Sequence, residues 1–216
     1  MDVEGTEGDE RMLMLDLFSG LHGASASFTD NGWEVISIEK NTELPATYHM
    51  DILEEKNMII EMFSDYQLDF IWASPPCYEF SQGWMAPRSI AAREGRLDGY
   101  EPDMSVVFAT LDIIRQLKPR YWALENVQGA CRYFEPYLGQ HRIKLGAAYI
   151  WGNFPRLGFK EISKGYKKEQ DTGSHDKLRS NKRAKVPYWI SDQIRISVQY
   201  QMMLDDFAQG LPPSRG

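Results

Sequence analysis

The sequence has little cysteine and no long apolar run. Its 216 residues include two cysteines, Cys77 and Cys131, which suggest neither a disulfide framework nor a metal site. No stretch of about 18 apolar residues occurs, which argues against a membrane-spanning helix. The beginning of the chain is acidic, unlike a secretory signal. We therefore expect a cytoplasmic protein with reduced thiols, in which residues 1–10 form a disordered leader and Cys131 is structural.

Basic residues are also scarce. Lys and Arg number 24 against 31 Asp and Glu, and the net charge of -7 is unusual for a protein that binds phosphates. The basic residues are unevenly distributed, however, because residues 160–185 hold nine of them against four acidic ones. This segment is either a solvated loop or a patch that faces phosphates. The length and the 43% hydrophobic content fit one globular domain.

Short apolar runs alternate with segments of helical periodicity. Strands are expected at 12–18, 33–38, 68–73, 121–124 and 149–152, and helices at 104–117 and 186–204, the last with Pro187 in its first turn. Residues 82–103 lack periodicity and are expected to form a long loop. The alternation predicts an α/β fold with a mixed, mostly parallel sheet and helices on both faces. Ligands of such sheets bind at the carboxyl ends of the strands.

A thiol and a carboxylic acid follow two of these expected strands. Two prolines precede Cys77 and fix the backbone that carries it. A free cysteine is more often a small buried hydrophobe, but that role needs no Pro-Pro before it. Glu125 ends the next apolar strand. If the two strands are neighbours, the thiolate can attack one atom of a ring while the acid protonates another.

The same residues carry a resemblance to a known family. The runs Asp16-Leu17-Phe18-Ser19-Gly20, Pro75-Pro76-Cys77 with Phe80-Ser81, and Glu125-Asn126-Val127 occur in the order and at the spacing found in cytosine-C5 DNA methyltransferases. The resemblance covers about residues 12–152 and resumes at 186–204. It implies a class I methyltransferase fold, which is Rossmann-like, that binds S-adenosylmethionine and acts on DNA. The chain is similar to a compact, phage-like form of the family, so a virus or phage origin is also implied.

The resemblance also implies roles for individual residues. Cys77 would add to C6 of a cytosine flipped out of the duplex, and Glu125 would stabilise the charge that develops in the ring. The loop 82–103 would close over that base. The cofactor residues would be Asp16, Phe18, Gly20, Gly23, Glu39, Asp51, Ile52 and Pro75, with Glu39 at the ribose and Asp51 and Ile52 at the adenine. Ser81 and Asn126 would lie on the substrate side, and no metal is expected.

The chain departs from the family pattern at three places. His22 stands where the family usually has a glycine. Gln140-His141-Arg142-Ile143-Lys144 is the nearest match to a Gln-x-Arg-x-Arg motif, which makes Arg142 the candidate catalytic cation and Lys144 a weaker one. The run from Arg183 to Pro187 replaces a Gly-Asn pair near the cofactor, so a modified, more anionic donor stays open.

The region available for target recognition is short, because 33 residues lie between Gly152 and Val186. We expect a catalytic and cofactor-binding domain at 11–159, a reduced recognition segment at 160–185, and a closing helix with a tail at 186–216. The substrate-binding candidates in the recognition segment are Lys164, Lys167, Lys168, Arg179 and Arg183. Three alternatives remain open: the same chemistry on RNA, a protein partner that supplies sequence specificity, and a non-catalytic nucleic-acid-binding module.

Overall fold

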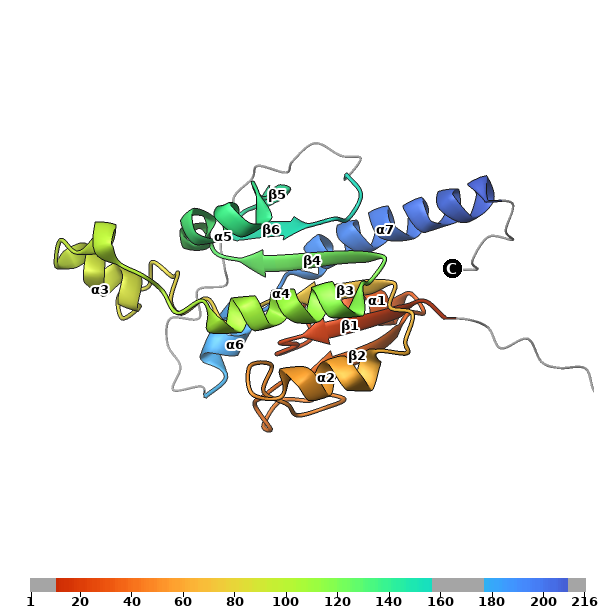
Figure 1. Ribbon diagram of the computed structural model, residues 1–216, viewed down its shortest axis with the longest axis horizontal. Coiled ribbons are helices and arrows are strands. Elements are labelled where there is room, and N and C mark those ends of the chain that lie inside the picture. The colour runs from red at the N-terminus through yellow and green to blue at the C-terminus, as the bar shows by residue number, and fades with distance from the viewer. Residues whose placement is uncertain (1–10, 157–176, 210–216) are drawn as a thin grey trace, which may run out of the picture.

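The computed structural model describes residues 11–156 and 177–209. Within these ranges a six-stranded sheet has the order β2-β1-β3-β4-β6-β5 (Figure 1). Its strands are β1 (Leu13–Leu17), β2 (Glu34–Ile38), β3 (Phe70–Ala73), β4 (Tyr121–Asn126), β5 (Ile143–Leu145) and β6 (Ala148–Gly152). The helices are α1 (Ala26–Asp30), α2 (Lys56–Phe63), α3 (Pro87–Arg93), α4 (Ser105–Leu117), α5 (Cys131–Leu138), α6 (Arg179–Ala184) and α7 (Tyr188–Ala208).

The strand order places a crevice at one edge of the sheet. Strands β2, β1, β3 and β4 are parallel, whereas β6 is antiparallel to both β4 and β5. The chain leaves β1 to form β2 on one side and returns to form β3 on the other. Neighbouring strands whose connections run in opposite directions leave room for a ligand beyond their carboxyl ends. A ligand site is therefore expected beyond the carboxyl ends of β1 and β3.

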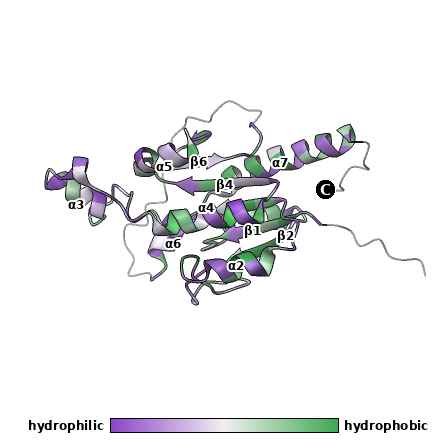
Figure 2. Ribbon diagram, in the orientation of Figure 1, coloured by the Kyte–Doolittle hydropathy of each residue, from purple (hydrophilic) through white to green (hydrophobic). Residues whose placement is uncertain are grey.

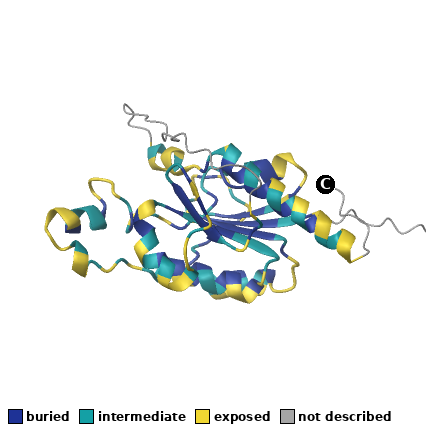
Figure 3. Cartoon of the chain, turned by 90° about the horizontal axis from the view of Figure 1, so that it is seen from above, coloured by how far each residue is buried: buried dark blue, intermediate teal, exposed yellow. Residues whose placement is uncertain are grey.

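Period-two alternation along the strands sends side chains to both faces of the sheet. Leu15 and Leu17 of β1 pack in a cluster with residues of α2, α4 and α5. Met14 packs in a second cluster with residues of α1 and α7. In Figure 3 the strands are mostly buried and the helices expose their outer sides. The structure thus confirms the predicted fold class, a mixed and mostly parallel sheet with helices on both faces.

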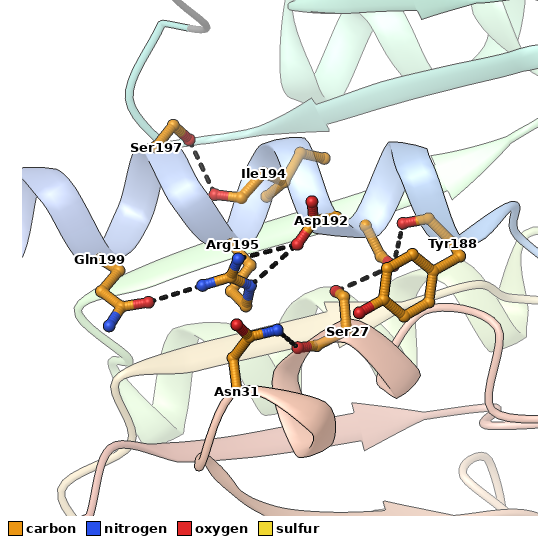
Figure 4. A network of polar contacts seen from close by, with 9 residues as sticks. Ser27, Asn31, Tyr188, Asp192, Ile194, Arg195, Ser197 and Gln199 are labelled. Carbon is orange, nitrogen blue, oxygen red and sulfur yellow. Dashed lines mark hydrogen bonds and ion pairs between the residues drawn. The ribbon is translucent and has the colours of Figure 1, made fainter. Parts of the chain in front are cut away.

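Helix α7 closes the second face against α1. Its buried side chains include Ile190, Ile194, Val198 and Met202. The hydroxyl of Ser27 in α1 donates to that of Ser191 (3.0 Å), and Arg195 pairs with Asp192 (2.8 Å; Figure 4). The rest of α7 carries a mixture of polar and apolar residues along its length (Figure 2). The predicted helix is present, but Pro187 is extended and caps it from outside the first turn.

The prediction of a long loop at 82–103 is wrong in part. Helix α3 forms within it, and a 3-10 turn follows at Leu97–Gly99. Pro87 stands at the first helical position, where its missing N–H costs nothing and its fixed φ suits a helix. Helix α3 stands away from the sheet, at the left of Figure 1. The segment is therefore an excursion from the body with a short helix of its own.

Candidate active site

The turn after β1 is built from backbone conformations that glycine adopts easily. Gly20 has a φ of 53°, but Phe18 (65°) and His22 (54°) share the positive sign. For side-chain-bearing residues this conformation is strained. The turn brings the amide of Gly20 to Oε2 of Glu39 (2.9 Å), while Oε1 accepts the amide of Asn41 (2.9 Å). Glu39 therefore ties the end of β1 to the end of β2.

A cavity of about 750 Å³ opens at the carboxyl ends of β1, β2 and β3. We call it the strand-end cavity. Six predicted cofactor residues line it: Phe18, Gly20, Gly23, Glu39, Asp51 and Ile52. Pro76, Val106 and residues of α6 complete the wall. The volume is within the range usual for small-molecule and cofactor sites.

Gly23 lets the C-terminal part of the described chain close this cavity. A β-carbon at Gly23 would lie 2.5 Å from the carbonyl oxygen of Val186 and 2.6 Å from its nitrogen. Real β-carbons do not approach backbone atoms so closely, so a larger residue here requires the backbone to move. The contact holds Lys185 and Val186, which precede α7, against the turn after β1. Both also line the cavity.

Two of the predicted cofactor residues do not line the cavity. Pro75 is buried behind it, and Pro76 lines the wall instead. Asp16 lies two residues after Met14 in β1, so both side chains point to the same face of the sheet, the one covered by α1. Its carboxylate is 1% exposed, and neither oxygen has a hydrogen-bond partner among the described residues. Burial raises the pKa of Asp16 to about 7; the charge of Glu39 acts in the same direction and the hydroxyl of Ser25 in the opposite one.

Asp51, the predicted adenine contact, sits on the rim of the cavity with its carboxylate engaged. One oxygen pairs with Lys40, which holds the pKa of Asp51 below its usual range. The other oxygen accepts the amide of Leu53 (2.8 Å). The neighbouring Ile52 is buried and turns an apolar surface toward the cavity.

Cys77 follows β3, and Glu125 lies near the end of β4, the parallel neighbour of β3, as the sequence-based interpretation required. Ala73 of β3 pairs with Leu124 of β4, so both residues lie at the same edge of the sheet. Asn126 fastens the two segments together. Its Nδ2 donates to the carbonyl of Pro75 (3.0 Å), and its Oδ1 accepts the amide of Val127 (2.9 Å). Asn126 is buried and engaged at both ends of its side chain.

The Cys77 turn, residues 75–81, is fixed further by its own hydrogen bonds. The amides of Phe80 (3.1 Å) and Ser81 (2.8 Å) donate to the carbonyl of Cys77. Phe80 is 1% exposed and packs against Phe134 of α5. A β-carbon at Gly129 would lie 1.9 Å from the carbonyl oxygen of Phe80. The sequence interpretation did not identify Gly129, whose absent side chain lets the segment after Glu125 lie against the Cys77 turn.

The excursion at 82–103 is anchored to the Cys77 turn at both ends. At its start the amide of Gly83 donates to the hydroxyl of Ser81 (3.0 Å), so this predicted substrate residue is engaged within the turn. At its end the hydroxyl of Tyr100 donates to the carbonyl of Glu79 (3.0 Å) and to its carboxylate. Burial and the charge of Glu79 raise the pKa of Tyr100. Between these anchors Trp84 is 73% exposed.

The structure does not bring Arg142 to this edge. Tyr149 pairs with Asn126 at the carboxyl end of β4, and β6 runs from there toward the other edge of the sheet. The guanidinium of Arg142 lies 5.6 Å from the ring centre of Phe154, which follows the far end of β6. Lys144 instead pairs with Tyr149 at the near end.

A second hollow of about 510 Å³ lies beside Lys144, and we call it the polar hollow. It is lined by Gln82, Arg88, Gln128, Gly129, Cys131, Arg132, Glu135, His141, Lys144 and Tyr149. Gln82 and Gln128 directly extend the Cys77 turn and the Glu125 segment. We call the end of the sheet that carries Cys77 and Glu125 the catalytic edge. Lys144, the weaker of the two cation candidates, therefore lies nearer the catalytic edge than Arg142, the stronger one.

The remaining predicted substrate residues fall into two groups. Arg179 and Arg183 belong to α6, whose Ser180, Asn181 and Ala184 line the strand-end cavity. Arg183 is exposed, whereas Nε of Arg179 is buried and has no hydrogen-bond partner among the described residues. Lys164, Lys167 and Lys168 lie outside the described residues.

Comparison with known proteins identifies the family. The model of the C-5 cytosine-specific DNA methylase family matches residues 12–133, more than half of the chain. The matched range includes the glycine turn, the Cys77 turn and the Glu125 segment described above. The chain therefore belongs to the C-5 cytosine-specific DNA methylase family and has the class I methyltransferase fold of that family.

Individual relatives are distant and matched over part of their length. The chain is 29% identical over 127 residues to the Type II methyltransferase M.HindV of Haemophilus influenzae, a match over 54% of this chain and 38% of that protein. A protein of Frog virus 3 named as a probable DNA (cytosine-5)-methyltransferase is 27% identical over 124 residues, 53% of each chain. The chain thus spans about half the length of these relatives or less.

Among solved structures, Entamoeba histolytica methyltransferase EhMeth is similar with 16% identity and a TM-score of 0.43, over 70% of this chain and 55% of that one. Spodoptera frugiperda DNMT2 matches with 19% identity and a TM-score of 0.41, over 78% and 59%. The family assignment rests on the family model rather than on these distant similarities.

No helix in the described parts of the chain has the length and apolar character needed to cross a membrane.

Proposed function

We propose that the protein transfers a methyl group from S-adenosylmethionine to C5 of cytosine in DNA through a covalent bond between Cys77 and C6. One observation carries the proposal: the hydrogen bond from Asn126 to the carbonyl of Pro75 holds the Cys77 turn against the Glu125 segment. A nucleophile and an acid are thereby kept at one edge of the sheet, next to a cavity of cofactor size.

The strand-end cavity fits the cofactor. Each oxygen of Glu39 accepts one backbone amide and keeps a further lone pair for a ribose hydroxyl. Phe18 and Ile52 offer apolar surfaces to the adenine. Pro76 belongs both to the wall of the cavity and to the Cys77 turn, so the cofactor end of the site adjoins the nucleophile. When bound, S-adenosylmethionine supplies an electrophilic methyl group.

Cys77 makes C5 of cytosine nucleophilic. Its thiolate forms a sulfur–carbon bond at C6, and the electron pair of the C5–C6 double bond moves toward C5 and the ring nitrogen N3. C5 then accepts the methyl group and its hydrogen leaves as a proton to solvent. The electrons of the C5–hydrogen bond restore the double bond, and the thiolate of Cys77 departs from C6. The base must leave the duplex for this attack to be possible.

Glu125 stabilises the charge that reaches the ring. As a carboxylic acid it donates a hydrogen bond to N3, and as a carboxylate it accepts one from the exocyclic amine. The residue is half-buried at the end of β4, where a low dielectric strengthens such bonds. Lys144, at the same end of the sheet, is one of the cations proposed for the substrate side.

DNA would approach the face that carries the excursion at 82–103 and α6. Trp84 is exposed on that excursion, with the guanidinium of Arg93 stacked over its ring at 3.9 Å. Arg179 and Arg183 would contact DNA from α6, and Lys164, Lys167 and Lys168 are proposed from sequence to contact phosphates.

Trapping with 5-fluorocytosine DNA tests the covalent step. Fluorine at C5 cannot leave as a proton, so elimination stalls and the enzyme stays attached to the DNA. We expect a shifted band on a denaturing gel for the wild type and none for Cys77→Ser. Cys131→Ser is the matched control and should still form the band. An adduct that persists in Cys77→Ser would rule out the proposal. An adduct lost only in Cys131→Ser would make Cys131 the nucleophile.

The nucleic acid is tested separately. Radiolabelled cofactor is supplied with duplex DNA or with tRNA, and the modified nucleosides are identified by mass spectrometry. We expect 5-methylcytosine from DNA. Label confined to tRNA would make RNA the substrate, a modified cytosine other than 5-methylcytosine would indicate a different donor, and no transfer to either would favour a non-catalytic binding module.

A further inference from the structure

A second cluster of reactive side chains lies outside the proposed methyl-transfer chemistry. One potential ligand atom from each of Cys131, Glu135 and His141 falls within 4.8 Å of the other two. Together they present a sulfur, a carboxylate oxygen and an imidazole nitrogen. Each of these three donor types is one that zinc accepts in proteins.

The fold holds these donors in place. Cys131 and Glu135 are four residues apart on α5, so they share one face of that helix. His141 lies in the connection from α5 to β5, and its ring packs edge-on against Tyr149 at 4.8 Å between ring centres. Nε1 of Trp151 donates to the carbonyl of Gly139 (3.1 Å), which fixes the connection just before His141. The cluster thus bridges α5 and the connection that leads into β5.

The donors are not satisfied by one another. Nδ1 of His141 is buried and has no hydrogen-bond partner among the described residues. It lies 3.8 Å from Oε1 of Glu135, too far for a hydrogen bond. A cation placed between the three would accept the unused lone pair of His141 and draw the sulfur of Cys131 and the carboxylate of Glu135 together.

We propose that Cys131, Glu135 and His141 bind a divalent transition-metal ion of the zinc class. Bonds of about 2.0–2.3 Å in a tetrahedron place the donor atoms about 3.3–3.8 Å apart. The donors, now within 4.8 Å, reach that spacing by side-chain rotations that move them about 1 Å. All three donors line the polar hollow, which has room for a water as the fourth ligand.

The charged groups around the polar hollow set the strength of binding. Arg88, Arg132 and Lys144 line it and oppose a dication. The two anionic ligands outweigh this repulsion because they bond the ion directly. The ion would tie α5 to the segment that enters β5. Gln128 lies in the 3-10 turn Gln128–Ala130 that leads directly into α5, and Lys144 lies in β5. The ion would therefore also stiffen the substrate side of the catalytic edge.

Cobalt(II) is the probe, because thiolate ligation gives a charge-transfer band and tetrahedral coordination gives intense visible bands. The full chain is stripped of metal with a chelator and titrated with Co²⁺. We expect saturation at one equivalent, both spectral features, and displacement by Zn²⁺. Cys131→Ser should lose the charge-transfer band, and Glu135→Gln and His141→Ala should each weaken binding about tenfold or more.

Cys77→Ser is the matched control, since it removes the other thiol and should leave the spectrum unchanged. Circular dichroism of each metal-free variant verifies that it folds, and none of these readouts depends on methyl transfer. Loss of the charge-transfer band in Cys77→Ser, or no saturable binding by the wild type, would overturn the proposal. As a second measurement, Zn²⁺ should raise the melting temperature of the wild type and not that of Cys131→Ser; an equal rise in both would also overturn it.

Discussion

The strand-end cavity and the catalytic edge differ in what fixes their geometry. One wall of the cavity is a single stretch of backbone, the turn from Phe18 to Gly23, whose positive φ values and bond to Glu39 set its form. The catalytic edge is assembled from two segments about fifty residues apart in sequence, joined by the Asn126–Pro75 bond and the approach of Gly129 to Phe80. The first is a local structure and the second a tertiary one.

This difference predicts how each region responds to mutation. Changes in the turn should alter cofactor affinity, because they reshape one wall of the cavity and leave the Cys77 turn in place. Changes at the catalytic edge should alter the rate of methyl transfer, because they move or remove reacting groups and leave the cavity intact. A substitution at either place that changed both quantities equally would show that the two regions act as one unit.

The largest effect is expected from Glu125→Gln. This change keeps the shape of the side chain but removes the ionisable proton, so charge in the ring loses its stabilisation. We expect kcat to fall on the order of 10²-fold or more, typical for a positioned acid. Cofactor affinity, measured by calorimetry, should stay unchanged. Near-normal turnover would remove Glu125 from the catalytic groups.

Gly129→Ala should act on the same edge without touching the substrate. The new β-carbon meets the carbonyl oxygen of Phe80 at 1.9 Å, so the Cys77 turn must move. A displacement of about 1 Å at a reacting group costs about 10²-fold in rate. Gly99→Ala is the matched control, because nothing lies within 4 Å of a β-carbon there. Equal kcat values for the two variants would show that the close approach at Gly129 is not required.

The same contrast explains what the sequence could predict. Five of the six described strands, the turn after β1 and the order of the motifs were predicted correctly, because each depends on a few contiguous residues. Helix α3 was missed, since seven residues give little periodicity and the signal was one proline at the first position. Helix α5 and strand β5 were also missed. Pro136 lies inside α5, where a proline in the sequence argues against a helix, and β5 has three residues.

Side-chain direction was harder to predict than position in the chain. Asp16 and Arg142 were chosen by their positions in sequence motifs, which do not give the direction of a side chain. Strand alternation points Asp16 to the α1 face, and Arg142 packs on Phe154. The importance of Gly129 could not be found from the sequence, since it depends on a contact with Phe80, which lies 49 residues earlier. Whether these residues contact cofactor or substrate stays a prediction.

Gly23→Ala should affect the cavity rather than the edge. The added methyl group overlaps backbone atoms of Val186 at 2.5 and 2.6 Å, so the segment before α7 must move off the turn. Overpacking of this kind costs about 1–3 kcal/mol. We expect S-adenosylmethionine affinity to fall about tenfold or more, with a smaller change in kcat at saturating cofactor. Unchanged affinity would show that the 184–186 segment does not contribute to the cofactor site.

Asp16 should make stability depend on pH. Its folded pKa, about 7, is above the value of about 3.9 for an unfolded chain, so the folded state binds one more proton between these values. The contribution of Asp16 to the free energy of unfolding is fully present below pH about 4. It is lost as the pH rises to about 7, at about 1.4 kcal/mol per pH unit. Urea unfolding from pH 5 to 7 should show this slope for the wild type relative to Asp16→Asn. Parallel curves would mean that Asp16 ionises normally.

The smallest effect is expected at His22, within the turn but outside the Gly23 contact. Its φ of 54° is a left-handed conformation that costs a side-chain-bearing residue about 1–2 kcal/mol. Glycine removes that cost but adds about 0.4–1 kcal/mol of chain entropy to the unfolded state. The 3.5 Å contact between Nδ1 of His22 and the hydroxyl of Ser25 is long and adds little. His22→Gly should therefore raise the free energy of unfolding by about 0.5–1 kcal/mol, measured by urea denaturation. Leu21→Gly, whose φ is not positive, is the control and should destabilise the protein. If His22→Gly were instead the less stable of the two, the imidazole would contribute more to the turn than its strain removes.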